Sequence, residues 1–420
     1  MPTVMPLLVP AQAFARDLDG ARRSTFGRAE TEWLALATIL HRLAHSAPDN
    51  HTALARQLAD SLRVDEAHIP AIEWTIGDDA RDSLADSLCT LGDQRGAEQL
   101  AAFVMTRAAA MENVGAFRLA YATLLSLHRA LPGLAEPARG LVIAQQGRVA
   151  RQFGDVRLAR EHYEEALRVG RRTGTPDVIV RALLGLGVLA NMRGNYPEAR
   201  RLFRAVLRRA SAPSLASHAA AAHHGLMLGA LAASDLARAL DHGWAAFQDT
   251  GKDPDRHADM AINLGEICLR LGEYRAALNS YLVALAGTSL ARLRLAALGG
   301  AVLAATRARE PGTLARLARE AEAEIARAQQ PFESAHTLVE LAEAFELAGA
   351  TERAASYRDR AAETAERGGF YEVIHRADSM AARLAARAES SRLSLGERSS
   401  RIVRAIEALP IDESASIANR

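Results

Sequence analysis

Lysine and cysteine are nearly absent from this chain of 420 residues, and long apolar runs are missing. Lys252 is the only lysine among 51 basic residues, so Schiff-base and P-loop mechanisms have a single candidate. The two cysteines, Cys89 and Cys268, lie far apart without metal-ligand spacing around them, which indicates a reducing compartment. No run of eighteen apolar residues occurs, so no membrane-spanning helix and no membrane partner are expected.

Excess charge is also lacking, because the formal net charge is only +1. Coating nucleic acid requires surplus positive charge to displace counterions, so nucleic acid is not an expected partner. The first fifteen residues contain three prolines and no basic residue, which is a poor match to a signal peptide. We therefore expect a cytoplasmic protein.

The chain is rich in small apolar residues and poor in aromatic ones. Hydrophobic residues make up 49% of it and aromatic residues 5%, which argues against disorder and favours closely packed helices. A chain of 420 residues exceeds the usual size of one core, so it should either divide into domains or repeat a small unit.

A fixed spacing recurs from about residue 100 onward. The three clearest copies are Gly147, Gly154, Ala159, Tyr163, Ala166; Gly187, Gly194, Ala199, Phe203, Val206; and Gly265, Gly272, Ala277, Tyr281, Ala284. Weaker copies in the same phase are Ala108, Gly115, Ala120, Leu124, Leu127; Met227, Ser234, Ala239, Gly243, Ala246; and Ala342, Gly349, Ala354, Arg358, Ala361. Near Gly299 only the first half of the pattern is kept, and Pro311 and Gly312 displace the rest.

The spacing predicts an amphipathic helix, a tight turn and a second helix in each unit. Gly154, Gly194 and Gly272 fall where the first helix should end in a left-handed residue. Asn195 and Glu198 resemble a capping box at the start of a second helix. The small residues in the pattern would let the paired helices approach closely, and the aromatic residue would fill the gap toward the next unit.

This signature resembles the tetratricopeptide repeat family over roughly residues 95–370. Its units start about 38 to 43 residues apart, longer than the usual 34, as in bacterial signal-sensing regulators of this type. The resemblance implies an all-α fold, a right-handed α-solenoid of stacked helix-turn-helix repeats. An ordinary helical bundle is the alternative, but a bundle requires no fixed phase of about 40 residues.

The flanking segments complete the predicted organisation: an extension over 1–28, a helical region over 29–94 that caps the repeats, and C-terminal helices with a flexible tail over 371–420. Helices are expected at about 29–46, 51–63 and 79–92. Residues 54–73 superficially resemble a helix-turn-helix DNA reader. The gap from Leu58 to Val64 is too long for its turn, Pro70 interrupts the second helix, and that helix carries acidic residues without lysine or arginine.

The C-terminal segment should hold an Ala/Arg-rich helix near 372–389 and a short helix around 398–408. Arg392, Arg398, Arg401 and Arg404 form a small basic patch there, typical of a solvated face.

Motifs of catalysis are missing. The sequence contains no Walker A, nucleophile-elbow, dinucleotide-binding or kinase motif, so we expect neither an enzyme nor a cofactor. His41 and His45 lie four residues apart on a helix, without the glutamate of a zinc hydrolase. His218, His223 and His224 cluster, with His242 on the next helix, and surface or groove histidines explain them better than a metal site.

The first helix of each unit lines the concave face of such a superhelix, so the phase predicts which side chains lie in the groove. The predicted ligand-binding residues are Arg148, Arg151, Arg181, Asn191, His224, Asn263, Glu266 and Arg270, with Gln152, Asp259, Glu343 and Glu346 beside them. Arginine would take a carboxylate bidentately, and asparagine would bond the backbone amides of an extended peptide. Any solvated helix face is about as polar, which is the plainer interpretation.

The sequence therefore favours a non-enzymatic scaffold or sensor that binds a protein or peptide in its concave groove. A homodimer is left open. The alternative is a transcriptional regulator in which the repeats sense a signal and the N-terminal helices contact DNA or polymerase.

Overall fold

A computed structural model describes residues 36, 40, 43, 53–57, 86, 88, 94–113, 116–131, 133–210, 215–249, 253–328, 330–380 and 396–411. These residues form helices and the turns between them, with no strand in that part of the chain. The chain divides into two units, Met1–Arg209 and Ala210–Arg420. The all-α prediction is confirmed. The helices predicted before residue 94 fall mostly outside the described residues, and those positions that are described there are helical.

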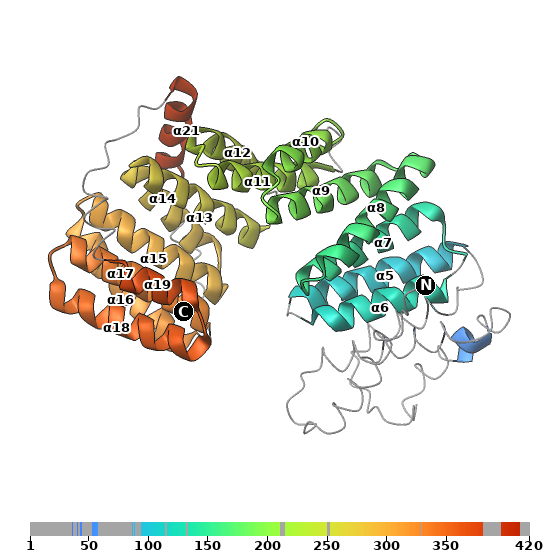
Figure 1. Cartoon of the computed structure of the whole chain (residues 1–420), viewed down its shortest axis with the longest axis horizontal. Helices are drawn as coiled ribbons and strands as arrows, with labels where there is room; N and C mark the ends of the chain where they lie inside the picture. The colour runs from blue at the N-terminus through green and yellow to red at the C-terminus, as the bar shows by residue number, and fades with distance from the viewer. Residues whose placement is uncertain are drawn as a thin grey trace. The chain divides into compact units, whose positions relative to one another are not determined.

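The N-terminal unit stacks three described helix pairs, in which consecutive helices pack against each other (Figure 1). The pairs are α5 (Gln94–Asn113) with α6 (Phe117–Ala130), α7 (Glu136–Gln152) with α8 (Val156–Thr173), and α9 (Pro176–Met192) with α10 (Tyr196–Leu207). The first helices α5, α7 and α9 also contact one another in order, so they form one layer of this unit.

The C-terminal unit stacks four pairs in the same way (Figure 1). They are α11 (Ala216–Ala232) with α12 (Leu236–Gln248), α13 (Pro254–Leu271) with α14 (Tyr274–Gly287), α15 (Ala291–Arg307) with α16 (Pro311–Arg327), and α17 (Pro331–Leu347) with α18 (Thr351–Gly368). Here α13, α15 and α17 are the first helices that contact one another in order. A short helix, α19 (Tyr371–Asp378), packs on α18 and α17.

The turn between the two helices of a pair repeats one backbone device. Gly154, Gly194, Gly272 and Gly349 all have positive φ, as a left-handed helix end requires. Asn195 begins α10 as predicted: its Oδ1 accepts from the Glu198 backbone N–H at 3.3 Å, and its Nδ2 donates to the Glu198 carboxylate at 2.7 Å. At these four turns, local signals in the sequence mark where the first helix stops and its partner starts.

Two turns use the same backbone without glycine. Ser234 has φ +56° and Arg309 has φ +62°. The unit near Gly299 is therefore complete, and the expectation that Pro311 and Gly312 displace its second half is wrong. Its turn lies at Arg309, α16 begins directly at Pro311, and Leu314, Ala318 and Ala321 occupy the buried positions that follow. The arginine hid this turn from a search based on glycine.

The core of each unit consists largely of small side chains between paired helices. Ala159, Ala199, Ala239, Ala277 and Ala354 hold the same place in their second helices and are all buried. An alanine at this place lets the two helices of a pair approach closely, so the prediction of close packing is confirmed.

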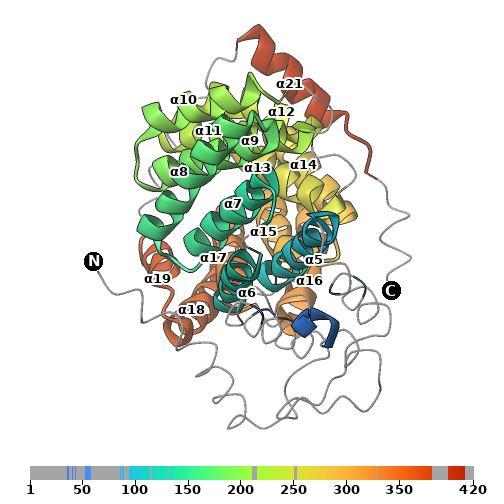
Figure 2. The ribbon, with the colours of Figure 1, turned by 90° about the vertical axis from the view of Figure 1, so that its right-hand side faces the viewer.

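The last described helix, α21 (Glu397–Glu407), packs on the second helices α12 and α14, as both views show (Figure 1; Figure 2). Ile402, Val403 and Ile406 are buried against them. The Asn279 side chain of α14 donates from Nδ2 to the carbonyl oxygens of Ile406 and Leu409, at 2.7 and 3.1 Å. The helix predicted at 398–408 is thus confirmed. Its Arg398 pairs with Asp241 at 3.1 Å, and Arg401 and Arg404 are exposed.

Candidate functional site

Two tyrosine rings of second helices pack directly on the backbone of first helices, at positions where those first helices have glycine. A Cβ on Gly147 would lie 2.9 Å from Cδ1 of Tyr163, and one on Gly185 would lie 2.1 Å from its Cζ. The Tyr163 ring therefore fills the space between α7 and α9. Tyr281 does the same between α13 and α15, over Gly265 and Gly300. Because glycine has no side chain, the ring can lie directly on the backbone of both helices.

Arg148, on α7, is held by a buried carboxylate. Its Nη2 lies 2.7 Å from Oε1 of Glu112 on α5; the Arg148 side chain is 47% exposed and that of Glu112 only 2%. Gln145 donates to the same oxygen at 3.2 Å and to the Met105 carbonyl at 3.0 Å. The guanidinium is thus fixed in place while half of the side chain stays open to solvent. Glu112 was not predicted, because nothing in its spacing marks it.

Arg151 lies one turn further along α7, beside Tyr163. Burial raises the pKa of the Tyr163 hydroxyl, and the nearby guanidinium groups of Arg151 and Arg148 oppose that rise. Three predicted polar residues, Arg148, Arg151 and Gln152, therefore lie on α7 with the hydroxyl of Tyr163 close to its arginines. The tyrosine hydroxyl was missed by the sequence argument, which treated the aromatic residue as filler.

Two further predicted residues, Arg181 and Asn191, lie on the next first helix of the same unit, α9. Arg181 is exposed, and its Nε donates to Asp177 of its own helix at 3.0 Å. Asn191 is partly buried near the end of α9. Contact between α7 and α9 places the two pairs of predicted residues in one layer.

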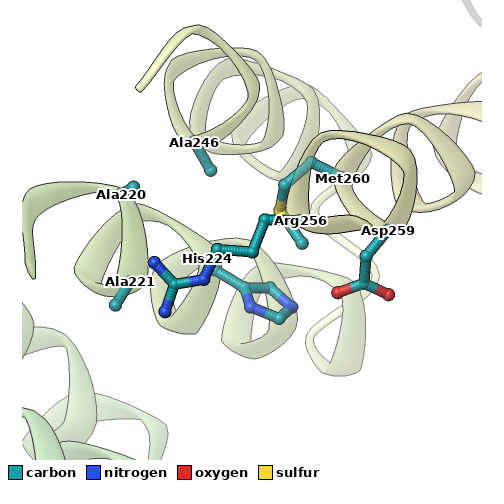
Figure 3. Close-up of a pocket in the computed structure, with 7 residues that line it drawn as sticks. All are labelled: Ala220, Ala221, His224, Ala246, Arg256, Asp259 and Met260. Atoms are coloured by element: carbon teal, nitrogen blue, oxygen red, sulfur yellow. The ribbon is translucent and has the colours of Figure 1, made fainter. Parts of the chain in front are cut away.

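His224 belongs to a small pocket of the C-terminal unit, between α11 and α13 (Figure 3). The lining residues are Ala220, Ala221, His224, Ala246, Arg256, Asp259 and Met260. The Asp259 carboxylate lies on the side of the His224 ring, and the Arg256 guanidinium on the side of Ala221 (Figure 3). Burial lowers the pKa of His224, Asp259 opposes that change and Arg256 adds to it. The pocket thus holds a neutral imidazole between opposite charges near neutral pH.

Glu266 and Arg270 line a second hollow of this unit. It is bounded by α12, α13, α14 and α15, and its lining residues are Leu236, Glu266, Leu269, Arg270, Tyr274, Leu303 and Arg307. The structure therefore brings these two predicted residues together, and it adds Arg307, which the repeat phase did not single out.

Asn263 and Glu343 were both expected to face the groove, but their side chains interact with other groups of the protein. The Asn263 side-chain amide donates to the Asp259 carbonyl of its own helix at 2.8 Å, so this donor is already used inside α13. Glu343 is buried, with Arg376 of α19 3.9 Å from its carboxylate. The backbone carbonyl four residues upstream in the same helix can thus bind a polar side chain that the repeat phase alone assigns to a ligand.

The clustered histidines and Cys268 are the remaining candidates for metal binding or nucleophilic chemistry. His223 and His242 lie with their Nδ1 atoms 3.1 Å apart, but no group of three metal-ligating residues occurs in the described part of the chain. Cys268 is a buried free thiol whose pKa burial raises to about 12, so it is not a nucleophile near neutral pH. Over the described residues, no helix is both long and apolar enough to cross a membrane.

Stacked helix pairs with a polar layer of first helices define a helical-repeat protein. Tetratricopeptide repeat models match residues 144–214 and 261–295. The chain therefore contains tetratricopeptide repeats in both units, and the resemblance seen in the spacing is confirmed. A comparison with curated proteins gives no match.

Solved structures of similar proteins include the apo form of RapI, with 13% identity and a TM-score of 0.47 over 63% of this chain and 97% of RapI. A Rap protein complexed with Competence and Sporulation Factor has 14% identity and a TM-score of 0.47, covering 81% of this chain and 97% of that one. The apo form of the quorum sensor NprR from B. thuringiensis has 14% identity and a TM-score of 0.45, covering 84% and 99%.

Proposed function

We propose that the layer of first helices binds an extended protein or peptide segment, and that the chain acts without catalysis as an adaptor or sensor. Tetratricopeptide repeats stack into surfaces suited to extended ligands, which supports the proposal. The observation that carries it is the arrangement around Arg148. A buried Glu112 fixes a half-exposed guanidinium, so little side-chain entropy is lost when a carboxylate of the ligand binds there.

The remaining predicted residues complete this proposal. Arg151, Arg181 and Asn191 would extend the contact along α7 and α9 of the N-terminal unit. In the C-terminal unit, taken by itself, His224, Glu266 and Arg270 would contact a bound segment at the two hollows of that unit. Asn263 keeps a smaller role, because its amide donor is engaged within its own helix.

The test is a selection of random peptides on the full chain, followed by measurement of the selected peptides on variants. Reversing the charge of Arg148 would leave Glu112 buried beside a second carboxylate and would destabilise the fold. Glutamine is therefore the better substitution, as the triple variant Arg148→Gln, Arg151→Gln, Arg181→Gln. We expect the Kd of acidic peptides to rise at least about tenfold, the equivalent of one charge-assisted hydrogen bond.

The matched control removes three exposed arginines of the second helices, Arg157→Gln, Arg168→Gln and Arg200→Gln. These changes should leave the Kd within about twofold, since surface charges contribute little to a ligand bound elsewhere. Equal losses in both triple variants, or no peptides at all in the selection, would refute binding by the first helices.

No observation favours the transcriptional regulator. Of the segment 54–73 that resembles a DNA reader, only residues 54–57 lie in the described part of the chain.

A further inference from the structure

Helix α15 has two consecutive glycines in its middle, Gly299 and Gly300, and each faces a polar side chain of another helix. A Cβ on Gly300 would lie 2.2 Å from Cζ of Tyr281, which comes from α14. A Cβ on Gly299 would lie 1.9 Å from Oε2 of Glu340, which comes from α17. Each glycine inside a helix costs roughly 0.5–1 kcal/mol relative to alanine, so helix propensity alone does not favour these two glycines. We call the place where Gly299, Gly300, Tyr281 and Glu340 meet the notch.

The two polar groups in the notch have no hydrogen-bond partner among the described residues. The Tyr281 side chain is 2% exposed, yet its hydroxyl makes no hydrogen bond in that part of the chain. The Glu340 carboxylate likewise accepts no hydrogen bond and forms no ion pair there. Glu340 is only partly buried, and neither its oxygens nor the Tyr281 oxygen belongs to the fully enclosed unpartnered atoms of the described residues, so a ligand can reach them. A group that donates hydrogen bonds to both oxygens would satisfy this notch.

Negative charge surrounds the notch. Glu266 of α13 and Glu343 of α17 both act on Glu340, and the positive charge that opposes them belongs to Arg376 of α19. Arg376 lies 3.9 Å from the Glu343 carboxylate and 3.1 Å from Nδ1 of His336, so it is already engaged. Burial, together with Glu266 and Glu343, raises the pKa of Glu340 to about 7 against the opposing effect of Arg376.

We infer that the notch formed by Gly299, Gly300, Tyr281 and Glu340 binds a cationic side chain, arginine or lysine, of the segment that the first helices hold. The inference rests on the proposed function and names the chemistry of one part of the ligand. Guanidinium and ammonium groups carry several N–H donors and a positive charge, which match a phenol oxygen and a carboxylate in an acidic setting. A metal ion is a poorer match, because the described residues contain no metal-ligating cluster.

The experiment measures the binding of three acetylated pentapeptide amides to the full chain by calorimetry: Ala-Ala-Arg-Ala-Ala and its versions with lysine or glutamine at the centre. We expect the arginine and lysine peptides to bind at least about tenfold more tightly than the glutamine peptide, and Glu340→Gln to abolish that preference. Tyr281→Phe should weaken the binding of both cationic peptides. Comparing arginine with lysine shows whether a planar fork or a point charge fits the notch better.

The pH dependence is a second readout. The groups that face Glu340 are Glu266, Glu343, Tyr281, Arg376 and, one turn away on α17, His336. Burial lowers the pKa of His336 and raises that of Tyr281, so both pKa values move away from pH 7. Between about pH 6 and pH 8, Glu340 becomes ionised, so the cationic peptides should bind more tightly as the pH rises. The Glu340→Gln variant should show no such trend.

Measuring the stability of Glu340→Gln tells whether a lost preference for cationic peptides comes from misfolding. Because the pKa of Glu340 is raised in the folded state, the stability present at low pH is lost as the pH rises through about 7. Glutamine does not ionise, so the variant does not lose stability in this way. It should therefore melt at or above the wild-type temperature at pH 8. The control Glu363→Gln, on the exposed face of α18, should change neither preference nor pH trend.

The outcomes separate the two proposals. If the preference for cationic peptides is absent in the wild type or unchanged in Glu340→Gln, the notch is not a cation site. The selected peptides can still depend on the arginines of α7 and α9, which would leave the proposed function standing.

Discussion

At the scale of single residues, the tyrosine of the repeat signature does more than fill space. The Tyr163 ring lies on the backbone of two first helices, and its hydroxyl comes near Arg151. The Tyr281 ring has the same place in its own repeat, with carboxylates near its hydroxyl. The residue after the first signature glycine is Arg148 in one repeat and Glu266 in the other. One backbone plan thus presents opposite charges in the two units.

Gly185→Ala tests this packing. A Cβ at this position would lie 2.1 Å from Cζ of Tyr163, so the ring or helix α9 must move. We expect a loss of about 1–3 kcal/mol in the free energy of unfolding, as overpacking of a core usually costs, measured by urea denaturation. The control is Gly312→Ala in the first turn of α16, where the added methyl group meets nothing within 4 Å. A Gly185→Ala variant as stable as Gly312→Ala would contradict the position of the ring.

At the scale of helices, one left-handed residue sets the turn in every pair from α7 and α8 to α17 and α18. Among the described residues, six turns or helix ends use a glycine with positive φ, while Ser234 and Arg309 adopt positive φ with a side chain. Such a residue is strained because its Cβ approaches the following carbonyl oxygen. The sequence marks these turns clearly where glycine is present and hides them where it is not.

Arg309→Gly should therefore stabilise the protein. Relief of left-handed strain is worth roughly 1–2 kcal/mol, and the greater freedom of glycine in the unfolded chain offsets roughly 0.5–1 kcal/mol of it. We expect a net gain of about 0.5–1 kcal/mol and a higher melting temperature by calorimetry. Gly349→Ala, at the equivalent turn with φ +78°, should move the stability in the opposite direction. The same sign for both variants would show that the backbone angle does not control these turns.

At the scale of the whole chain, contacts between distant segments complete the C-terminal unit. Helix α21 is separated from α14 by more than a hundred residues, yet α14 supplies the side chain that binds its last carbonyl groups. An exposed helix end would leave these carbonyl oxygens to solvent, and Asn279 satisfies two of them. The surface formed by α12 and α14 is thereby covered by the chain itself.

Asn279→Ala should loosen α21 without unfolding the repeats. The loss of two hydrogen bonds should cost about 1–2 kcal/mol locally. Backbone amides of residues 397–407 should then exchange with deuterium faster, while those of α13 and α14 keep their protection. Arg398→Ala removes an exposed ion pair with Asp241 and should have little effect. Unchanged exchange over α21 in Asn279→Ala would mean that its apolar face alone holds the helix.

The sequence by itself determined the helix pairs, because glycine positions, capping residues and apolar spacing act within a few residues of one another. It predicted the turn at Gly194, the cap at Asn195 and the helix around 398–408. It also placed Arg148, Arg151, Glu266 and Arg270 on the first helices, since their place follows from the repeat phase.

Only the tertiary structure decided which of these side chains are open to a ligand. Glu112 binds Arg148 from 36 residues away, and Asn263 turns back on its own helix. Glu340 meets Gly299 only because α15 and α17 pack together. Such contacts depend on which helices become neighbours and how closely they approach, and no local pattern in the sequence contains that information.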